Sequence, residues 1–149
     1  MKRLTLELSN LRLDNNFSLK LADYALSRDM FPEDYCCLAN NLNKPVKWMS
    51  LESIENNIYN VKTDIWECGV AIWECFMLST QPYENIDPLD LADYMNESEL
   101  NRLQKPSNCP EQLYDIYVKC WNSTVSERPT LKELFYSIHK FYTNLNNFV

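Results

Sequence analysis

One stretch decides the fold of this chain: residues 64–77, with the sequence DIWECGVAIWECFM. Its apolar residues recur at helical spacing and point to nearly every side of a helix. A helix that is apolar all round belongs in the centre of a domain. The stretch therefore predicts a central helix in a mainly helical fold, and Thr63 is placed to cap that helix.

Three more helices are expected after this one. Asp87-Pro88 has the pattern of an N-cap followed by a first helical residue, Pro110 opens the next helix, and Thr130 and Glu133 form the capping box of the last. The apolar stripes of the three helices are, in order, Leu91, Ala92 and Met95; Leu113, Ile116, Tyr117, Cys120 and Trp121; and Leu131, Leu134, Phe135, Ile138 and Tyr142.

The first part of the chain predicts strands instead. Leu11–Leu13 and the alternating run Phe17–Leu21 are separated by Asp14, Asn15 and Asn16, which favour a turn, so we expect a hairpin. Residues 27–44 show no period of either kind. The fold class is therefore α+β, mainly α-helical, in one domain that covers residues 1–149.

Composition excludes several functions. With 46% hydrophobic residues the chain is able to bury a core, and its net charge of −7 gives no positive field for binding nucleic acid. The single glycine, Gly69, rules out a glycine-rich phosphate loop within this chain. The apolar run around it is too short for direct membrane insertion, so we expect the chain to be soluble when expressed by itself.

Six cysteines show neither a zinc-ligand spacing nor a disulfide framework. They are Cys36, Cys37, Cys68, Cys75, Cys109 and Cys120. We interpret them as reduced and partly buried thiols of an intracellular protein.

Six segments, taken in order, resemble the C-terminal lobe of a protein kinase domain of the tyrosine kinase group. They are the start of an activation loop at 20–28 (KLADYALSR), its end at 45–52 (PVKWMSLE), the central helix at 64–74, Gln81-Pro82-Tyr83, Cys109-Pro110 with Cys120-Trp121, and Arg128-Pro129. The resemblance covers nearly the whole chain and implies a kinase-like C-lobe without the N-lobe.

Within that group, the altered start of the activation loop and the runs at 26–35 and 43–53 look most like the Ryk/Derailed receptors. These are atypical receptor tyrosine kinases, or pseudokinases, that bind Wnt ligands and cross the membrane once. In the full family domain the cofactors are ATP and Mg²⁺. The resemblance implies a place on the cytoplasmic side of the plasma membrane.

The resemblance also shows which residues needed for phosphate transfer are replaced in this chain. It aligns Asn10 and Asp23 with the family's metal ligands, but Thr5 stands where the proton-accepting Asp belongs. A neutral hydroxyl does not accept a proton near pH 7. Tyr24 and Ala25 replace the Phe and Gly of the metal-binding motif, and Ala resists backbone conformations that Gly allows. We therefore predict no catalytic residue and only a vestigial metal site at Asn10 and Asp23; the alternative for Asp23 is an ordinary acid at a strand end.

Four other positions align with known features of the family. Glu52 and Arg128 match a buried ion pair that joins the end of the activation segment to the loop before the last helix. Asp64 matches an acid that accepts backbone N–H groups of the catalytic loop; it would suit the first turn of a helix in any case. Tyr35 matches a phosphorylation site, which another kinase would modify.

Two main functional hypotheses follow. The first is a catalytically inactive kinase-like module that binds intracellular signalling proteins, with the helix after Asp87 and the surface around Cys120-Trp121 as contact regions. The second is a piece of a longer, ATP-binding tyrosine kinase with transmembrane receptor activity. A third hypothesis is a chain with no independent activity that unfolds without cooperativity.

Overall fold

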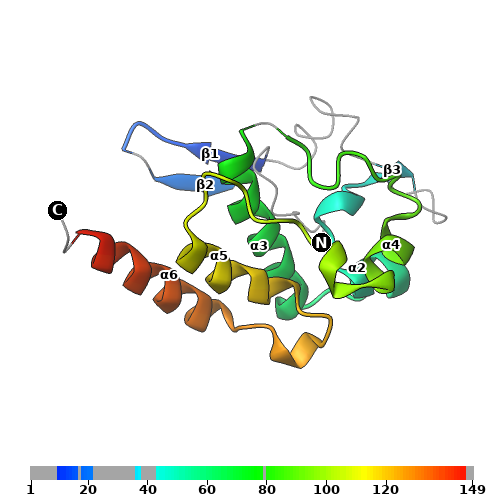
Figure 1. Ribbon diagram of the computed structural model, residues 1–149. Helices are drawn as coiled ribbons and strands as arrows, with labels where there is room; N and C mark the ends of the chain where they lie inside the picture. Colours follow the sequence, from blue (N-terminus) through cyan, green and yellow to red (C-terminus); the bar gives the residue numbers. More distant parts are fainter. Residues whose placement is uncertain (1–9, 17, 22–35, 38–42, 79, 147–149) are drawn as a thin grey trace.

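The computed structural model describes residues 10–16, 18–21, 36–37, 43–78 and 80–146. It contains two small sheets and a larger helical body (Figure 1). The strands are β1 (Leu11–Leu13), β2 (Leu19–Leu21), β3 (Cys36–Cys37) and β4 (Asn43–Lys44). The α-helices are α2 (Leu51–Asn56), α3 (Val61–Met77), α4 (Leu91–Glu97), α5 (Glu111–Tyr117) and α6 (Leu131–Asn146). Single 3₁₀ turns are η3 (Val46–Trp48), η4 (Glu99–Asn101), η5 (Val118–Trp121) and η6 (Val125–Glu127).

The predicted hairpin is confirmed. Strands β1 and β2 are antiparallel with Leu11 opposite Leu21 and Leu13 opposite Leu19. The Asp14 carboxylate accepts hydrogen bonds from the backbone N–H groups of Asn16 and Ser18, at 2.9 Å each, and so holds the turn. A second antiparallel pair, β3 with β4, lies on the other side of the body (Figure 1).

Helix α3 is the central helix that the sequence predicts. Its N-cap is Asn60 and not Thr63: the Asn60 side chain accepts from the backbone N–H of Lys62 and Thr63, and the Thr63 hydroxyl accepts from the Asn60 N–H. Thr63 is therefore the second half of a capping box, three residues inside the helix. The prediction found the right motif and placed the helix start too late.

The close packing of η5 on α3 explains why the helix has a glycine at position 69. A Cβ atom built on Gly69 would lie 2.8 Å from the Cβ of Cys120 and 2.8 Å from the indole Nε1 of Trp121. These two residues belong to η5, which packs across the helix at this point. Only a residue without a side chain lets the two segments approach so closely.

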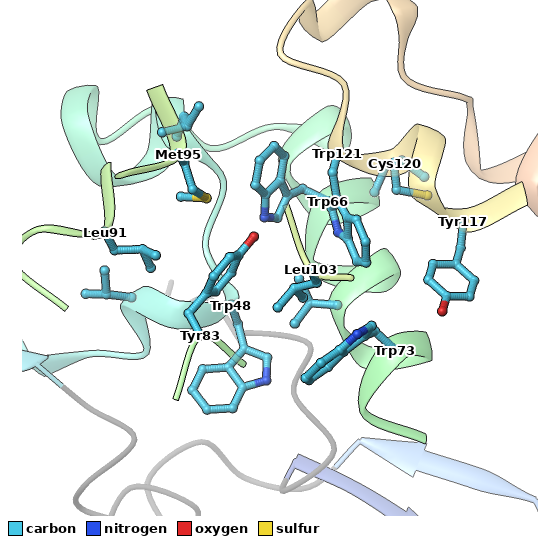
Figure 2. Packing of buried hydrophobic residues seen from close by; sticks show 14 of the residues in the cluster. Trp48, Trp66, Trp73, Tyr83, Leu91, Met95, Leu103, Tyr117, Cys120 and Trp121 are labelled. Atoms are coloured by element: carbon cyan, nitrogen blue, oxygen red, sulfur yellow. The ribbon is translucent and has the colours of Figure 1, made fainter. Parts of the chain in front are cut away.

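All four tryptophans are in the core (Figure 2). Trp66 and Trp121 lie near its centre, and Trp48 and Trp73 lie toward the side of the two strands of the hairpin. Tyr117 packs edge to face on Trp121 with ring centroids 5.6 Å apart. Aromatic side chains from η3, α5 and η5 thus pack in one core with those of α3.

Two other predictions are wrong in part. Helix α4 begins at Leu91, not Pro88: the Asp87 carboxylate accepts from Leu89 N–H, so Asp87 holds a turn that ends at Asp90, the actual N-cap. In α6 the capping box of Thr130 and Glu133 is confirmed. Of the predicted α6 stripe, however, Leu134 is buried and Ile138 partly buried, whereas the other three residues are exposed.

Candidate functional site

The ion pair predicted between Glu52 and Arg128 is present and links two segments far apart in the sequence. Arg128 donates from Nη1 to Glu52 Oε1 at 2.6 Å and from Nη2 to Glu52 Oε2 at 3.0 Å. The Arg128 side chain is 1% exposed and that of Glu52 is 14% exposed. Two parallel charge-assisted hydrogen bonds fix both position and orientation, so this contact defines how α2 sits against the loop before α6.

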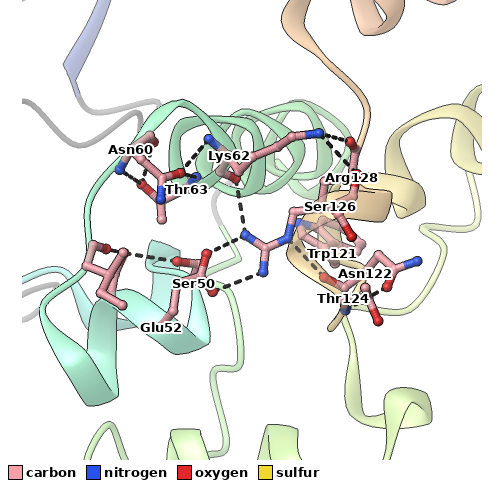
Figure 3. A network of polar contacts seen from close by, with 12 residues as sticks. Ser50, Glu52, Asn60, Lys62, Thr63, Trp121, Asn122, Thr124, Ser126 and Arg128 are labelled. Atoms are coloured by element: carbon pink, nitrogen blue, oxygen red, sulfur yellow. Dashed lines mark hydrogen bonds and ion pairs between the residues drawn. The ribbon is translucent and has the colours of Figure 1, made fainter.

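Arg128 also holds the start of α3 (Figure 3). It donates to the carbonyl oxygens of Lys62, at 3.2 Å, and of Asn122, at 2.9 Å. In return the Lys62 ammonium donates to the carbonyl oxygens of Arg128 and Ser126. We call Glu52, Lys62, Asn122 and Arg128 the Arg128 junction; it ties α2, α3 and the loop before α6 together.

The charge state of Glu52 follows from this setting. Burial acts to raise the pKa of its carboxyl, but hydrogen bonds from Arg128 and the backbone, with the positive charge of Arg128, hold the pKa below its ordinary value. Glu52 is therefore ionised at neutral pH, and the ion pair is complete.

A second buried guanidinium, Arg102, was not predicted. Arg102 donates to the carbonyl oxygens of Met95, at 2.8 Å, and of Trp121, at 3.2 Å. Its guanidinium lies 5.3 Å from the centroid of the Trp66 ring, and that of Arg128 lies 4.9 Å from the same centroid. Burial lowers the pKa of Arg102 from its ordinary value. Because its hydrogen-bond partners are backbone carbonyl groups in α4 and η5, no sequence pattern points to this residue.

The predicted metal site is only half within the described residues. Asn10 lies directly before β1 with its side chain fully buried, so its amide is not presented to solvent. Asp23 lies outside the described residues, as do Thr5, Tyr24, Ala25 and the phosphorylation candidate Tyr35. Among the residues that the structure describes, no group of three or more His, Cys, Asp or Glu side chains is arranged to hold a metal ion.

Asp64 lies in the first turn of α3 with an exposed side chain. That position suits an acid near a helix N-terminus. The catalytic-loop segment that the resemblance assigns to it falls in residues 1–9, outside the described part.

The surface predicted around Cys120 and Trp121 is wrong as a contact region. Both residues are buried, at 0% and 2% exposure, and they pack on α3. Burial raises the pKa of the Cys120 thiol to about 12, so it is protonated. Cys68, Cys75, Cys109 and Cys120 are free cysteines in the described part of the chain, and the redox state of all six stays a prediction.

Comparison with known proteins decides the family. The family described as protein tyrosine and serine/threonine kinase matches residues 5–138. The chain belongs to the protein kinase family. The Arg128 junction and α3 are therefore parts of a kinase C-lobe fold, which confirms the fold that the resemblance predicted.

Individual relatives confirm the predicted resemblance to the Ryk/Derailed group. The chain is 39% identical over 140 residues to the "Tyrosine-protein kinase RYK" of Mus musculus and to the "Tyrosine-protein kinase Dnt" of Drosophila melanogaster. It is 37% identical over 137 residues to the "Inactive tyrosine-protein kinase RYK" of Caenorhabditis elegans. These alignments cover 92–94% of this chain but only 23–24% of each relative.

The chain thus spans about a quarter of the length of the curated relatives that it matches. Across the described residues of this kinase C-lobe, none of the helices has the length and apolar character needed to cross a membrane.

Proposed function

We propose that this chain is a kinase-like C-lobe that does not transfer phosphate and that acts through protein contacts. Its place would be the cytoplasmic side of the plasma membrane, within a Ryk-like receptor, and its partners would be intracellular signalling proteins. The observation that carries the proposal is Thr5 at the position that the resemblance aligns with the proton-accepting Asp, because a neutral hydroxyl does not accept the substrate proton near pH 7.

A further observation supports this proposal. One relative, from Caenorhabditis elegans, is itself named an inactive tyrosine-protein kinase. By contrast, the Arg128 junction, which organises the shape of the lobe, has every partner in place.

The contact region would include the segment around α4. This is one of the two contact regions that the sequence predicts, and it has exposed residues. Leu89 and Leu100 are exposed on either side of α4, and Asp87, Asp90, Asp93 and Glu97 give the same region a negative charge. Phosphorylation of Tyr35 by another kinase would add a regulated contact, since a phosphate brings new charge and acceptor oxygens.

A competing function has its own support. Several relatives are named tyrosine-protein kinases, and this chain spans under a quarter of their length, so an ATP-binding and active longer protein is the second candidate. Asn10 and Asp23 keep the residue types that such a protein would use to hold Mg²⁺.

A thermal shift measurement with Mg²⁺ and ATP separates the two. A ligand at 100 times its dissociation constant stabilises a protein by about 2.7 kcal/mol, and we expect no such shift at millimolar ATP. A shift that disappears in Asp23→Asn but persists in Asp90→Asn, an exposed acid on the far segment before α4, would show a retained nucleotide site and overturn the proposal.

A further inference from the structure

The connection between α2 and α3 presents a tyrosine, Tyr59, at the surface of the lobe. The Tyr59 side chain is 40% exposed, and every residue from Glu55 to Val61 is exposed as well. Residues 57–60 belong to neither helix. The phenol and the chain on both sides of it are therefore open to an approaching enzyme, as is usual for functional positions on connecting segments.

A lysine is already placed on the hydroxyl of this tyrosine. Lys44, in β4, donates from Nζ to Tyr59 Oη at 2.9 Å and lies 5.5 Å from the centroid of the Tyr59 ring. The same ammonium donates to the side-chain carbonyl of Asn57. An ammonium group has three donors and no acceptor, so it serves oxygen atoms only. A positive charge thus lies next to the one atom of Tyr59 that an enzyme could modify.

The backbone around Tyr59 is anchored on both sides. The carbonyl oxygen of Ile58 accepts from the Ser53 hydroxyl at 2.8 Å. The N–H of Asn60 donates to the Thr63 hydroxyl at 3.0 Å, as part of the capping box of α3. Because both neighbours are held by side chains of the adjoining helices, the connection keeps the Tyr59 hydroxyl beside Lys44.

We propose that Tyr59 is a phosphorylation site and that Lys44 holds the phosphate. Another tyrosine kinase would transfer the γ-phosphoryl group of ATP to Tyr59 Oη: the bond from Oη to phosphorus forms, the bond from phosphorus to the leaving ADP breaks, and the phenol proton is released. The phosphate carries a charge of about −1.5 to −2 at pH 7 and three acceptor oxygens. Lys44 would then exchange a neutral acceptor for a charged one, and such hydrogen bonds are roughly twice as strong.

The surrounding charges favour a phosphate at this position. Tyr59 directly precedes Asn60, the N-cap of α3, and the N-terminus is the end of a helix at which negative charge is stabilising. The nearest acid in the sequence is Glu55, whose carboxylate accepts a hydrogen bond from the side chain of Asn96 in α4 at 2.7 Å. Glu55 is therefore engaged with a different helix, whereas Lys44 is engaged with Tyr59 itself.

Tyr142 provides a matched comparison within the same chain. It is 60% exposed, but it lies near the C-terminal end of α6, where negative charge is destabilising. Residues three and four positions away share its side of the helix. They are Ile138, His139, Leu145 and Asn146, with no lysine or arginine among them. Exposure alone therefore does not distinguish the two tyrosines, and the cation beside Tyr59 does.

Phosphopeptide mapping tests the site. The chain is expressed in animal cells with tyrosine phosphatases inhibited, and its phosphotyrosines are located by mass spectrometry. We expect phosphate on Tyr59 at a higher occupancy than on Tyr142. Absence of phosphate from Tyr59, or an occupancy no higher than that of Tyr142, would overturn the proposal. The result does not depend on whether this chain itself binds ATP, so it stands apart from the thermal shift test of the proposed function.

Phosphorus NMR of the phosphorylated chain tests the role of Lys44. A neighbouring positive charge favours the dianion, so the second pKa of the phosphate should fall from its ordinary value of about 6 to about 5.5 or below. In Lys44→Gln it should return to about 6. Lys119→Gln, at an exposed lysine in η5, is the matched control and should leave the lowered value unchanged. The same phosphate pKa with and without Lys44 would show that this lysine does not hold the phosphate. A cooperative melt of each variant shows that the fold is kept.

Discussion

Helices α3 and α6 are nearly equal in length, at 17 and 16 residues, yet their surroundings are opposite. Most of α3 between Thr63 and Trp73 is buried, whereas Leu134 is the one buried residue among the described side chains of α6, which packs on α5. The difference indicates which contacts stabilise this lobe. Contacts around α3 join separate segments of the chain, whereas the outer face of α6 joins no described segments. The predictions below test that contrast.

The largest effect is expected at the Arg128 junction. Arg128→Met leaves the Glu52 carboxylate partly buried without its partner and removes donors from the Lys62 and Asn122 carbonyl groups. Breaking a buried pair from one side typically costs about 3–5 kcal/mol, which urea unfolding would measure. The double variant with Glu52→Gln should lose less than the sum of the single losses. A loss below about 1 kcal/mol would mean that the pair behaves as a surface contact.

Acid should break the same pair reversibly. The pKa of Glu52 is lowered in the folded chain, so its contribution to stability is fully present above the ordinary carboxyl pKa of about 4.3 and is lost as pH falls through the lowered value. The free energy of unfolding of the wild type should exceed that of Glu52→Gln at pH 7, and the difference should shrink as the pH is lowered toward about 3. A difference that stays constant with pH would exclude a role for the charge of Glu52.

Gly69→Ala tests the close approach of η5 to α3. The new Cβ would lie 2.8 Å from atoms of both Cys120 and Trp121, so the two segments must separate. Overpacking of this kind costs about 1–3 kcal/mol, although alanine by itself would favour the helix by about 1 kcal/mol. The opposite substitution, Ala71→Gly, in the same helix is the control and should cost about 1 kcal/mol through helix propensity, with a further loss from its buried methyl group. Stabilisation of the Gly69→Ala variant would show that η5 does not pack so closely.

A smaller loss is expected at the cap of α3. Asn60→Ala removes the acceptor for the Lys62 and Thr63 N–H groups and should cost about 1 kcal/mol in thermal or urea unfolding. Asn60→Ser keeps an acceptor oxygen and should stay close to the wild type. If Thr63→Ala alone destabilises the chain more than Asn60→Ala does, Thr63 is the dominant cap after all.

The central helix and the ion pair of Glu52 and Arg128 could be predicted, because the first rests on a strong local pattern and the second on aligned motifs. The exact start of α3 could not, since Asn60 and Thr63 are both good capping residues and only the geometry shows that they cap each other. The start of α4 failed for a similar reason: Asp87-Pro88 suits a turn as well as a helix start.

Other features depend on contacts that no local pattern records. Arg102 is held by carbonyl groups from two distant segments, so its sequence neighbourhood gives no sign of burial. The periodicity of α6 identifies an apolar face but does not tell which part of that face meets α5. The candidate metal site was predicted by resemblance alone, and of its two residues only Asn10 is in the described part of the chain.

The smallest effect is expected on the outer face of α6, where neighbouring residues provide a matched pair. Leu134→Ala, on the buried side, should cost about 2–5 kcal/mol, because it leaves a cavity against α5. Phe135→Ser, one residue further on, should change the free energy of unfolding of the dilute monomer by no more than about 0.5 kcal/mol. If both substitutions cost the same at low concentration, then the outer face is packed within a single chain, and the contrast between α3 and α6 fails.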